Sequence, residues 1–222
     1  SYKLTDTLSV TGGIRYTHDK KHLVQRAPQV RELDASFSRF NYAASINWQA
    51  TPSMLVYART ASGYKAGGFN ARSINSGFDP ESLTSYEAGI KSDWLARRLR
   101  LNLTGFYASH SDLQLQQFQA GTSGASSITV NAGKARYWGI EAELTVKPID
   151  TLTLGANLGY TNRKYKQFLI LDPTTNQIVD VKDSARFLVG ATTTVSAYAQ
   201  WDVAELSFGR LSVRGDYDYR TI

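Results

Sequence analysis

The sequence contains no cysteine, one methionine and only three histidines among its 222 residues. Without cysteine, the chain has neither a disulfide framework nor a thiolate metal site. It also lacks long apolar runs, since its densest hydrophobic patch is the tetrapeptide from Phe168 to Leu171. A membrane-spanning helix needs about 20 successive apolar residues, so the sequence excludes one. A membrane-spanning barrel is compatible with this composition, because each of its strands is polar on one face.

Positive charge is in excess but is not concentrated in any one region. The net charge is +6, and the 25 Lys and Arg residues are spread along the whole chain. Nucleic-acid-binding proteins usually gather their cations in a patch or along one helix. We therefore expect no nucleic-acid partner. The residue pattern also indicates no bound metal ion and no organic cofactor.

Apolar and polar residues alternate with a period of two along most of the chain. In one stretch, every second position is apolar and the positions between are Asn, Ala or Ser; the apolar members are Phe40, Tyr42, Ala44, Ile46 and Trp48. Successive side chains of a strand point to opposite faces, so this period predicts strands with one apolar and one polar face. We predict nine strands and, at residues 1–4, the end of another. The nine are residues 8–26, 37–50, 54–66, 81–94, 98–118, 127–147, 152–169, 184–201 and 205–222.

The predicted connections alternate between short turns and long loops. The short turns are residues 5–7, 50–53, 95–97, 148–151 and 202–204, and the long loops are residues 27–36, 67–80, 119–126 and 170–183. Outer-membrane barrels have short turns at one end and long loops at the other. No domain linker and no signal peptide are visible, and both ends of the chain are strand-like. We therefore expect residues 1–222 to be one domain, a segment of a larger barrel.

Three features favour lipid over a soluble antiparallel sheet, which would also alternate. Several predicted strands exceed 14 residues, whereas soluble strands have a typical length of about 5 to 6. The polar face of the predicted strands carries Ser, Thr, Asn, Gly and Gln, which suits the water-filled lumen of a barrel. Trp48, Trp94 and Trp201 lie towards the short turns, whereas Tyr64 and Tyr160 lie towards the long loops. Two such aromatic belts mark the two membrane interfaces.

The predicted fold class is therefore all-β: an antiparallel up-and-down transmembrane β-barrel. About nine consecutive strands are present, and these cannot close a large barrel by themselves. A curved open sheet is expected if the segment is seen alone. Because an unpaired strand edge is not tolerated in the hydrocarbon of a membrane, strands outside this segment must complete the barrel.

Local segments along the chain resemble strands of TonB-dependent receptors, and they occur in the family's order. These segments are GIRYTHDK at 13–20, VYAR at 56–59 with GYKAGGFN at 63–70, PE at 80–81 with YEAGIK at 86–91, DLQ at 112–114, and NAGKA at 131–135 with GIEAE at 139–143. The resemblance covers nearly the whole chain. It identifies the sequence as similar to the barrel of these receptors, without their plug and without their C-terminal strands.

The resemblance implies a barrel of about 22 strands with a plugged lumen. It further implies a bacterial outer-membrane receptor that imports a ferric siderophore or a similar large nutrient, energised through TonB by the plug. The expected partners are outer-membrane lipid, the plug and remaining strands, TonB through the plug, and an extracellular small-molecule ligand. A passive porin-like channel, which has no plug, is the alternative.

Ligand contacts are expected where the outer strand ends and long loops converge above the lumen. Aromatic rings together with Arg or Lys suit an anionic, planar ferric chelate. Three sets of residues are candidates: first Tyr64, Lys65, Phe69, Asn70 and Arg72; second Gln114, Gln116, Gln117 and Phe118; third Tyr165 and Gln167.

No enzymatic site is expected. His110 and Asp112 flank Ser111, but a catalytic triad is defined by geometry, and consecutive strand residues point to opposite faces. Glu141 and Glu143 share one face, as do Asp216 and Asp218. We expect these carboxylates to pair with neighbouring cations such as Lys91 and Arg214.

Overall fold

The computed structural model describes residues 1–26, 30–70, 77–121, 124–172, 174–175, 177–187 and 190–221, and the side chains of residues 118–126 lie outside that description. An 11-stranded sheet runs in the order β1-β2-β3-β4-β7-β8-β9-β10-β12-β13, with β11 paired to β10, and β5 and β6 form a separate pair. All of these pairings are antiparallel, and consecutive long strands are neighbours, as in an up-and-down barrel.

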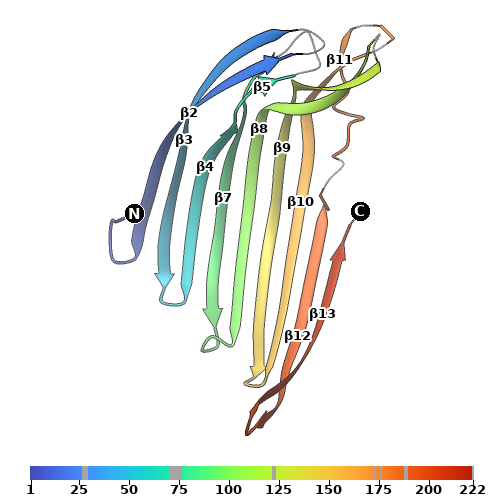
Figure 1. Ribbon diagram of the computed structural model, residues 1–222. Coiled ribbons are helices and arrows are strands. Elements are labelled where there is room, and N and C mark those ends of the chain that lie inside the picture. The colour runs from blue at the N-terminus through green and yellow to red at the C-terminus, as the bar shows by residue number, and fades with distance from the viewer. Residues whose placement is uncertain are drawn as a thin grey trace.

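The strands differ greatly in length, from 2 residues in β1 to 26 in β9. Their bounds are β1 Tyr2–Lys3, β2 Leu8–Gln25, β3 Arg31–Thr51, β4 Met54–Lys65, β5 Gly68–Phe69, β6 Gly77–Phe78, β7 Glu81–Trp94, β8 Leu99–Gly121, β9 Gly124–Ile149, β10 Leu152–Leu171, β11 Ile178–Asp180, β12 Thr193–Leu206 and β13 Gly209–Arg220. Figure 1 shows one open wall of strands, with the short turns along its lower end and the long connections at its upper end. Within the described ranges, no helix has the length and hydropathy needed to cross a membrane.

The nine predicted strands and the strand end at residues 1–4 are confirmed, but two of the predicted long loops are wrong. The chain pairs further into these regions: β3 already begins at Arg31, and β8 and β9 continue to Gly121 and from Gly124. These strand tips mix polar and apolar residues, as where Leu23 pairs with Leu33 next to His22 paired with Asp34, so the regular period of two is lost although the pairing continues. At one tip, His22 Nδ1 lies 2.9 Å from Asp34 Oδ1, across the β2–β3 pair.

Two predicted boundaries near the C-terminus are also wrong. The strand predicted from residue 184 begins only at Thr193, because residues 190 and 191 are held by Arg163, whose Nη1 donates to both of their carbonyl oxygens. The turn predicted at 202–204 is a bulge between Asp202 and Ala204, and the chain turns at residues 207–208 instead. A bulge interrupts the alternation in the same way as a turn does, so the pattern could not separate the two.

One face of the sheet, here called the apolar face, is not covered by any other part of the described chain. A cross-strand row on this face runs through Trp48, Val56, Ile90, Leu103 and Ala142. Large apolar side chains elsewhere on it are highly exposed, such as Ile14 at 79%. Among the described residues, only three alanines are buried apolar residues, and no large side chain is fully buried. A second sheet stacked on this face, which the soluble alternative requires, is not present within the described chain.

Aromatic side chains border the apolar face on both sides, as predicted. Towards the short turns, Trp94 Nε1 donates to Ser92 Oγ at 3.0 Å, and Ser92 Oγ donates to the Leu101 carbonyl oxygen at 2.8 Å. Ser92 is thereby buried without an unpaired polar atom. Towards the long connections, the rings of Trp138 and Tyr160 have centroids 5.6 Å apart. Rings with an apolar body and a polar edge are suited to the boundary between hydrocarbon and water.

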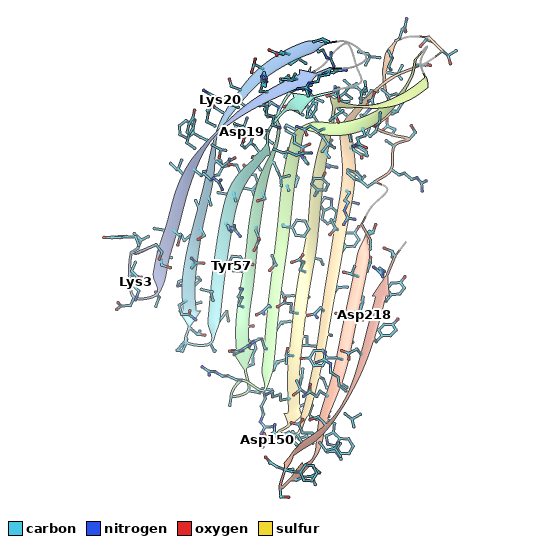
Figure 2. The ribbon with its side chains drawn as sticks, viewed as in Figure 1. Lys3, Asp19, Lys20, Tyr57, Asp150 and Asp218 are labelled. Atoms are coloured by element: carbon cyan, nitrogen blue, oxygen red, sulfur yellow. The ribbon has the colours of Figure 1, made fainter. Side chains whose placement is uncertain are left out.

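The opposite face, here called the polar face, stacks aromatic rings over glycines of the neighbouring strand. Three directly paired couples share this arrangement: Tyr57 with Gly89, Phe106 with Gly139, and Tyr198 with Gly155. In each couple the ring occupies the space that a Cβ would need. Figure 2 shows Tyr57 at mid-height on the wall. Its hydroxyl donates to Glu87 Oε1 at 2.7 Å and lies 2.9 Å from Thr104 Oγ1, which joins β4, β7 and β8.

The expected charge pairing on the polar face is confirmed for Arg214, which pairs with Asp216 at 2.7 Å. It is wrong for Glu143, whose Oε2 accepts a hydrogen bond from Asn102 Nδ2 at 3.0 Å. Lys91 lies over the Tyr57 ring, with Nζ 5.7 Å from the ring centroid. Register decides these partners, and register cannot be obtained from the residue types alone.

We expect Gly89→Ala to destabilise the sheet by about 1–3 kcal/mol, because an added Cβ would lie 2.6 Å from the Leu103 carbonyl oxygen and 2.7 Å from the Tyr57 ring. Gly105→Ala is the matched control, since nothing lies within 4 Å of its added Cβ. Denaturant unfolding of the full-length protein in detergent measures both. Equal stability of the two variants would contradict the stacking of Tyr57 on Gly89.

Candidate functional site

Glu81 organises the polar face at the upper end of the wall. It begins β7 and is directly paired with Lys65, the last residue of β4. Its carboxylate lies 3.6 Å from Lys65 Nζ and 3.6 Å from His110 Nε2, and it accepts a hydrogen bond from the Gln114 backbone N–H at 2.7 Å. The Glu81 side chain is only 12% exposed. A buried carboxylate is stable when paired and hydrogen-bonded in this way, so it fixes the ends of β4, β7 and β8 relative to one another.

Side-chain amides clamp the segment between β4 and β7 onto β9. Asn70 Nδ2 donates to the Thr129 carbonyl oxygen at 2.7 Å, and the Thr129 N–H donates to Asn70 Oδ1 at 2.8 Å. Asn131 forms a similar pair of hydrogen bonds with the backbone of Asp79, at 2.6 and 2.7 Å. Asn70 is buried and both ends of its amide are used. Asn70, which the sequence predicts to contact ligand, therefore fixes the segment between β4 and β7 to β9. The upper end of the polar face, where the long connections meet, is here called the mouth.

A cavity of about 460 Å³ lies beside this clamp. It is lined by Lys21, Lys65, Ala66, Phe78, Gln114, Gln116 and Thr129. It thus brings together one residue of the first predicted set, Lys65, with two of the second, Gln114 and Gln116. The Gln114 amide nitrogen already donates to the Ala66 and Asp79 carbonyl oxygens at 3.1 and 3.0 Å.

An aromatic stack occupies the next part of the mouth, between β9, β10 and the segment before β12. The Tyr165 and Phe187 rings are parallel, with centroids 4.0 Å apart and planes at 5°. Phe187 also meets Tyr137 edge-on at 5.7 Å, and Tyr165 meets Phe168 edge-on at 4.7 Å. The segment before β12 therefore folds against the wall, which is why it does not continue as strand.

A second cavity, of about 420 Å³, lies at this stack and is rich in cations. Its basic lining residues are Arg163, Lys164, Lys182 and Arg186, and Asp183 is an acidic one. Lys182 pairs with Asp183 at 3.2 Å, and Arg163 is engaged with the backbone of residues 190 and 191. Arg186 is exposed and, among described side chains, has no ion pair or hydrogen bond. Tyr165, from the third predicted set, lines this cavity too.

Two further residues connect these cavities. His110 contacts Glu81 on one side, and its Nδ1 lies 3.5 Å from the Tyr137 hydroxyl on the other. Tyr137 in turn contacts Phe187. A continuous series of side-chain contacts thus runs from Lys65, in the first cavity, to Phe187, in the second.

Other predicted site residues lie elsewhere. The Tyr64 hydroxyl donates to the Asp19 carboxylate on β2 and lines neither cavity. Gln117 Nε2 donates to the Leu169 carbonyl oxygen at 2.5 Å, so its amide nitrogen ties β8 to β10. Gln167 lies at a bulge of β10, opposite Lys134.

The remaining three candidates are only partly defined. Phe69 pairs with Gly77 in the β5–β6 hairpin. Arg72 lies outside the described residues, as does the side chain of Phe118.

The sequence reasoning missed Glu81, His110, Tyr137, Arg186 and Phe187. The first three lie on the polar face near a long connection. They come together because of the register in which β7 pairs with β8 and β8 pairs with β9. A search for inward-facing positions at the upper strand ends would have found these three. Arg186 and Phe187 were placed inside a predicted strand, and no pattern in the sequence marks them as part of the mouth.

Comparison with known proteins supports the architecture. The family model described as "TonB dependent receptor-like, beta-barrel" matches residues 1–221. The chain belongs to this family. Residence in the bacterial outer membrane follows from that membership.

Individual relatives agree with the TonB-dependent receptor assignment. The chain is 28% identical over 152 residues to the pesticin receptor of Yersinia enterocolitica, a match covering 64% of this chain and 22% of the relative. It is also similar in fold to the ferric yersiniabactin uptake receptor FyuA from Yersinia pestis, with a TM-score of 0.70 and 21% identity over 95% of this chain and 31% of the other. The alcaligin outer-membrane receptor FauA from Bordetella pertussis gives a TM-score of 0.65 and 18% identity, over 99% of this chain and 36% of the other. This chain therefore spans about a fifth to a third of the length of these receptors.

In this TonB-dependent receptor barrel, Asp180 anchors the connection that carries Phe187. Asp180 Oδ1 accepts hydrogen bonds from the backbone N–H groups of Phe168 at 3.0 Å and of Lys182 at 3.1 Å. These hydrogen bonds, the one from Phe168 above all, hold the pKa of the Asp180 carboxyl below its ordinary value. A lowered pKa means that this anchor stabilises the connection above the ordinary carboxyl pKa and is lost as the pH falls through the folded value.

We expect Asp180→Ala to reduce the hydrogen-exchange protection of the Phe168 amide at neutral pH, because that amide loses its charged acceptor. In the parent receptor the same protection should fall when the pH is lowered through the Asp180 pKa. Asp150→Ala is the control, since Asp150 lies in a short turn at the other end of the wall, where it pairs with Arg98 (Figure 2). Unchanged Phe168 protection in Asp180→Ala would show that the anchor does not form.

Proposed function

We propose that this chain forms part of the wall and mouth of a receptor that imports a ferric siderophore. A plug domain, coupled to TonB, would supply the energy for passage through the barrel. The mouth residues would bind the ferric chelate from the extracellular side.

The second cavity and its aromatic stack carry this proposal. Ferric chelates are commonly anionic and present flat, conjugated surfaces. Arg186 can donate to an oxyanion through its planar guanidinium, while Tyr165 and Phe187 offer ring surface beside it. Lys65 and Gln116 extend polar recognition into the first cavity. Together the two cavities suit a ligand that is larger than either one.

The names of relatives support the same substrate class. The pesticin receptor, the ferric yersiniabactin receptor and the alcaligin receptor are similar over 64%, 95% and 99% of this chain. A further relative, the ferric-pyoverdine M114 receptor PbuA of Pseudomonas sp., is 36% identical over 80 residues, which is 36% of this chain and 9% of that receptor. The passive porin-like channel is not favoured by these matches.

Arg186→Gln in the full-length receptor should weaken binding of its ferric siderophore about tenfold or more, because one charge-assisted hydrogen bond contributes roughly 1.5–3 kcal/mol. Titration with a panel of catecholate, hydroxamate and carboxylate ferric chelates, followed by tryptophan fluorescence, identifies the ligand and measures the loss. Lys147→Gln removes the same charge at the short-turn end and should leave binding unchanged. Equal affinity of Arg186→Gln and the parent for every bound chelate would show that the second cavity does not bind the ligand.

Energised import predicts that a protonophore stops radioactive iron uptake in cells that express the full-length receptor, while surface binding of the chelate persists. Transport through a passive channel follows the concentration gradient and would continue after the proton gradient has collapsed. Continued uptake at an undiminished rate would refute the coupling to TonB.

A further inference from the structure

Glu81 is a buried carboxylate with a basic side chain on each side of it. Its Oε1 lies 3.6 Å from Lys65 Nζ, and its Oε2 lies 3.6 Å from His110 Nε2. The Glu81 side chain is 12% exposed, whereas that of Lys65 is 67% exposed. An ionised carboxylate with so little access to water needs a cation beside it. The fold therefore offers Glu81 a permanent cation, Lys65, and a titratable one, His110.

His110 has the geometry of a titratable partner. Its side chain is 18% exposed, and its directly paired residues, Leu83 on β7 and Ala135 on β9, carry no charge. Its Nδ1 lies 3.5 Å from the Tyr137 hydroxyl. A neutral imidazole can donate from Nε2 and accept at Nδ1, whereas an imidazolium donates from both nitrogens. The Glu81 carboxylate and the Tyr137 hydroxyl can therefore serve either form of the ring.

The surroundings of His110 favour a neutral ring while Lys65 is in place. His110 lies beyond Tyr107 and its directly paired Trp138, which belongs to the aromatic belt, so it is outside the hydrocarbon. Burial, above all, holds the pKa of His110 below its ordinary value, while the Glu81 carboxylate raises that pKa and the Lys65 ammonium lowers it. Other ionisable groups nearby are the exposed Asp112 on the same strand, Tyr137 on β9 and, acting on Tyr137 from β10, Tyr165 and Arg163.

Lys65 also lines the first cavity, so an anionic ligand in that cavity competes with Glu81 for the Lys65 ammonium group. When Lys65 turns to the ligand, Glu81 stays buried but loses its cation, which is unfavourable. At the same time, the Lys65 ammonium no longer opposes a positive charge on His110, and the carboxylate attracts that charge more strongly. The pKa of His110 therefore rises, and the ring takes up a proton at a pH at which it was neutral before.

We propose that His110 is the reserve cation of Glu81, and that binding of an anionic ligand to Lys65 is coupled to protonation of His110. This inference rests on the proposed binding of a ferric chelate and adds a regulation to it. The protonated ring replaces Lys65 beside Glu81, which keeps its hydrogen bond from the Gln114 N–H, so the ends of β4, β7 and β8 stay together. The imidazolium also donates from Nδ1 to the Tyr137 hydroxyl.

The coupling has a definite sign. The pKa of His110 is low in the free mouth and higher in the ligand-bound mouth, so binding takes up a proton. Affinity for an anionic ligand therefore rises as the pH falls between these two pKa values, by about tenfold per pH unit at most. Above the higher value and below the lower one, the affinity no longer depends on His110.

The first test measures the exchange at Glu81 without any ligand. In the full-length receptor, Lys65→Gln imitates withdrawal of the ammonium group, and NMR of isotope-labelled histidine follows the titration of His110, whose signal is identified by its loss in His110→Gln. Lys65→Gln should raise the pKa of His110, and the rise should be smaller in a Glu81→Gln background, which lacks the carboxylate that needs a second cation. Lys147→Gln, at the short-turn end, is the control and should leave this pKa unchanged. An equal rise in both backgrounds would overturn the proposal, because it would show only repulsion between Lys65 and His110.

The second test adds the ligand. Anionic ferric catecholate and ferric citrate complexes are titrated into the parent receptor and into His110→Gln at about pH 5.5 and at about pH 7.5, on either side of the ordinary histidine pKa. A complex that binds should bind the parent about tenfold more tightly at the lower pH, and His110→Gln should lose this difference. Protonation of the complex itself affects both proteins equally, so the comparison between them removes it.

The outcomes separate this inference from the proposed function. The same pH dependence of binding in the parent and in His110→Gln would refute the coupling, even though the ferric ligand itself would stand. If neither complex binds while the ligand-free titration behaves as expected, the proposed ferric ligand is wrong and the exchange of cations at Glu81 is retained.

Discussion

The pairing of every backbone polar group within the sheet is the constraint on which this structure depends. In hydrocarbon, an unpaired N–H or C=O group is strongly unfavourable, so strands must be continuously paired across the membrane. The long uninterrupted ladders of β2 with β3 and of β7 with β8 satisfy this requirement. Continuous pairing in turn forces side chains to alternate, so one sequence supplies both a surface for lipid and a polar wall for the lumen.

The glycine couples show how the polar face keeps its shape without a core. Gly89, Gly139 and Gly155 each accept a ring from the adjacent strand, which packs large side chains flat against the backbone. Such couples fix the register between β4 and β7, between β8 and β9, and between β10 and β12. The mouth then depends on this register, because Glu81 meets Lys65 only when β4 and β7 pair as they do.

The sequence was sufficient for the fold class, the nine long strands and the two aromatic belts, because all of these follow from the period of two and from residue type. The sequence-based boundaries were wrong at the β3 tip near Arg31, at the start of β12 and at the bulge near Asp202. At these points strand pairing continues or stops for reasons other than burial. The start of β12 is set by the hydrogen bonds from Arg163 and by the packing of Phe187.

The candidate site was only partly predictable for a related reason. Lys65, Gln114, Gln116 and Tyr165 were predicted because polar or aromatic residues near long loops are natural ligand contacts, and they line the two cavities. Asn70 and Gln117 have the same character, yet their amides bond the backbone of neighbouring segments, as the Gln114 amide nitrogen also does. Only three-dimensional pairing distinguishes an amide that is free for a ligand from one that holds a loop.

The most direct test of the account is the environment of the two faces in a lipid bilayer. This chain contributes no cysteine of its own. In the full-length receptor, with any cysteine outside this chain replaced, single nitroxide labels can be placed by Ile90→Cys and Leu103→Cys on the apolar face and by Asn102→Cys on the polar face. The account predicts that the first two labels collide with membrane-dissolved oxygen and that the third is reached by a water-soluble nickel chelate. Equal access of the nickel chelate to all three labels would contradict a wall that separates lipid from an aqueous interior.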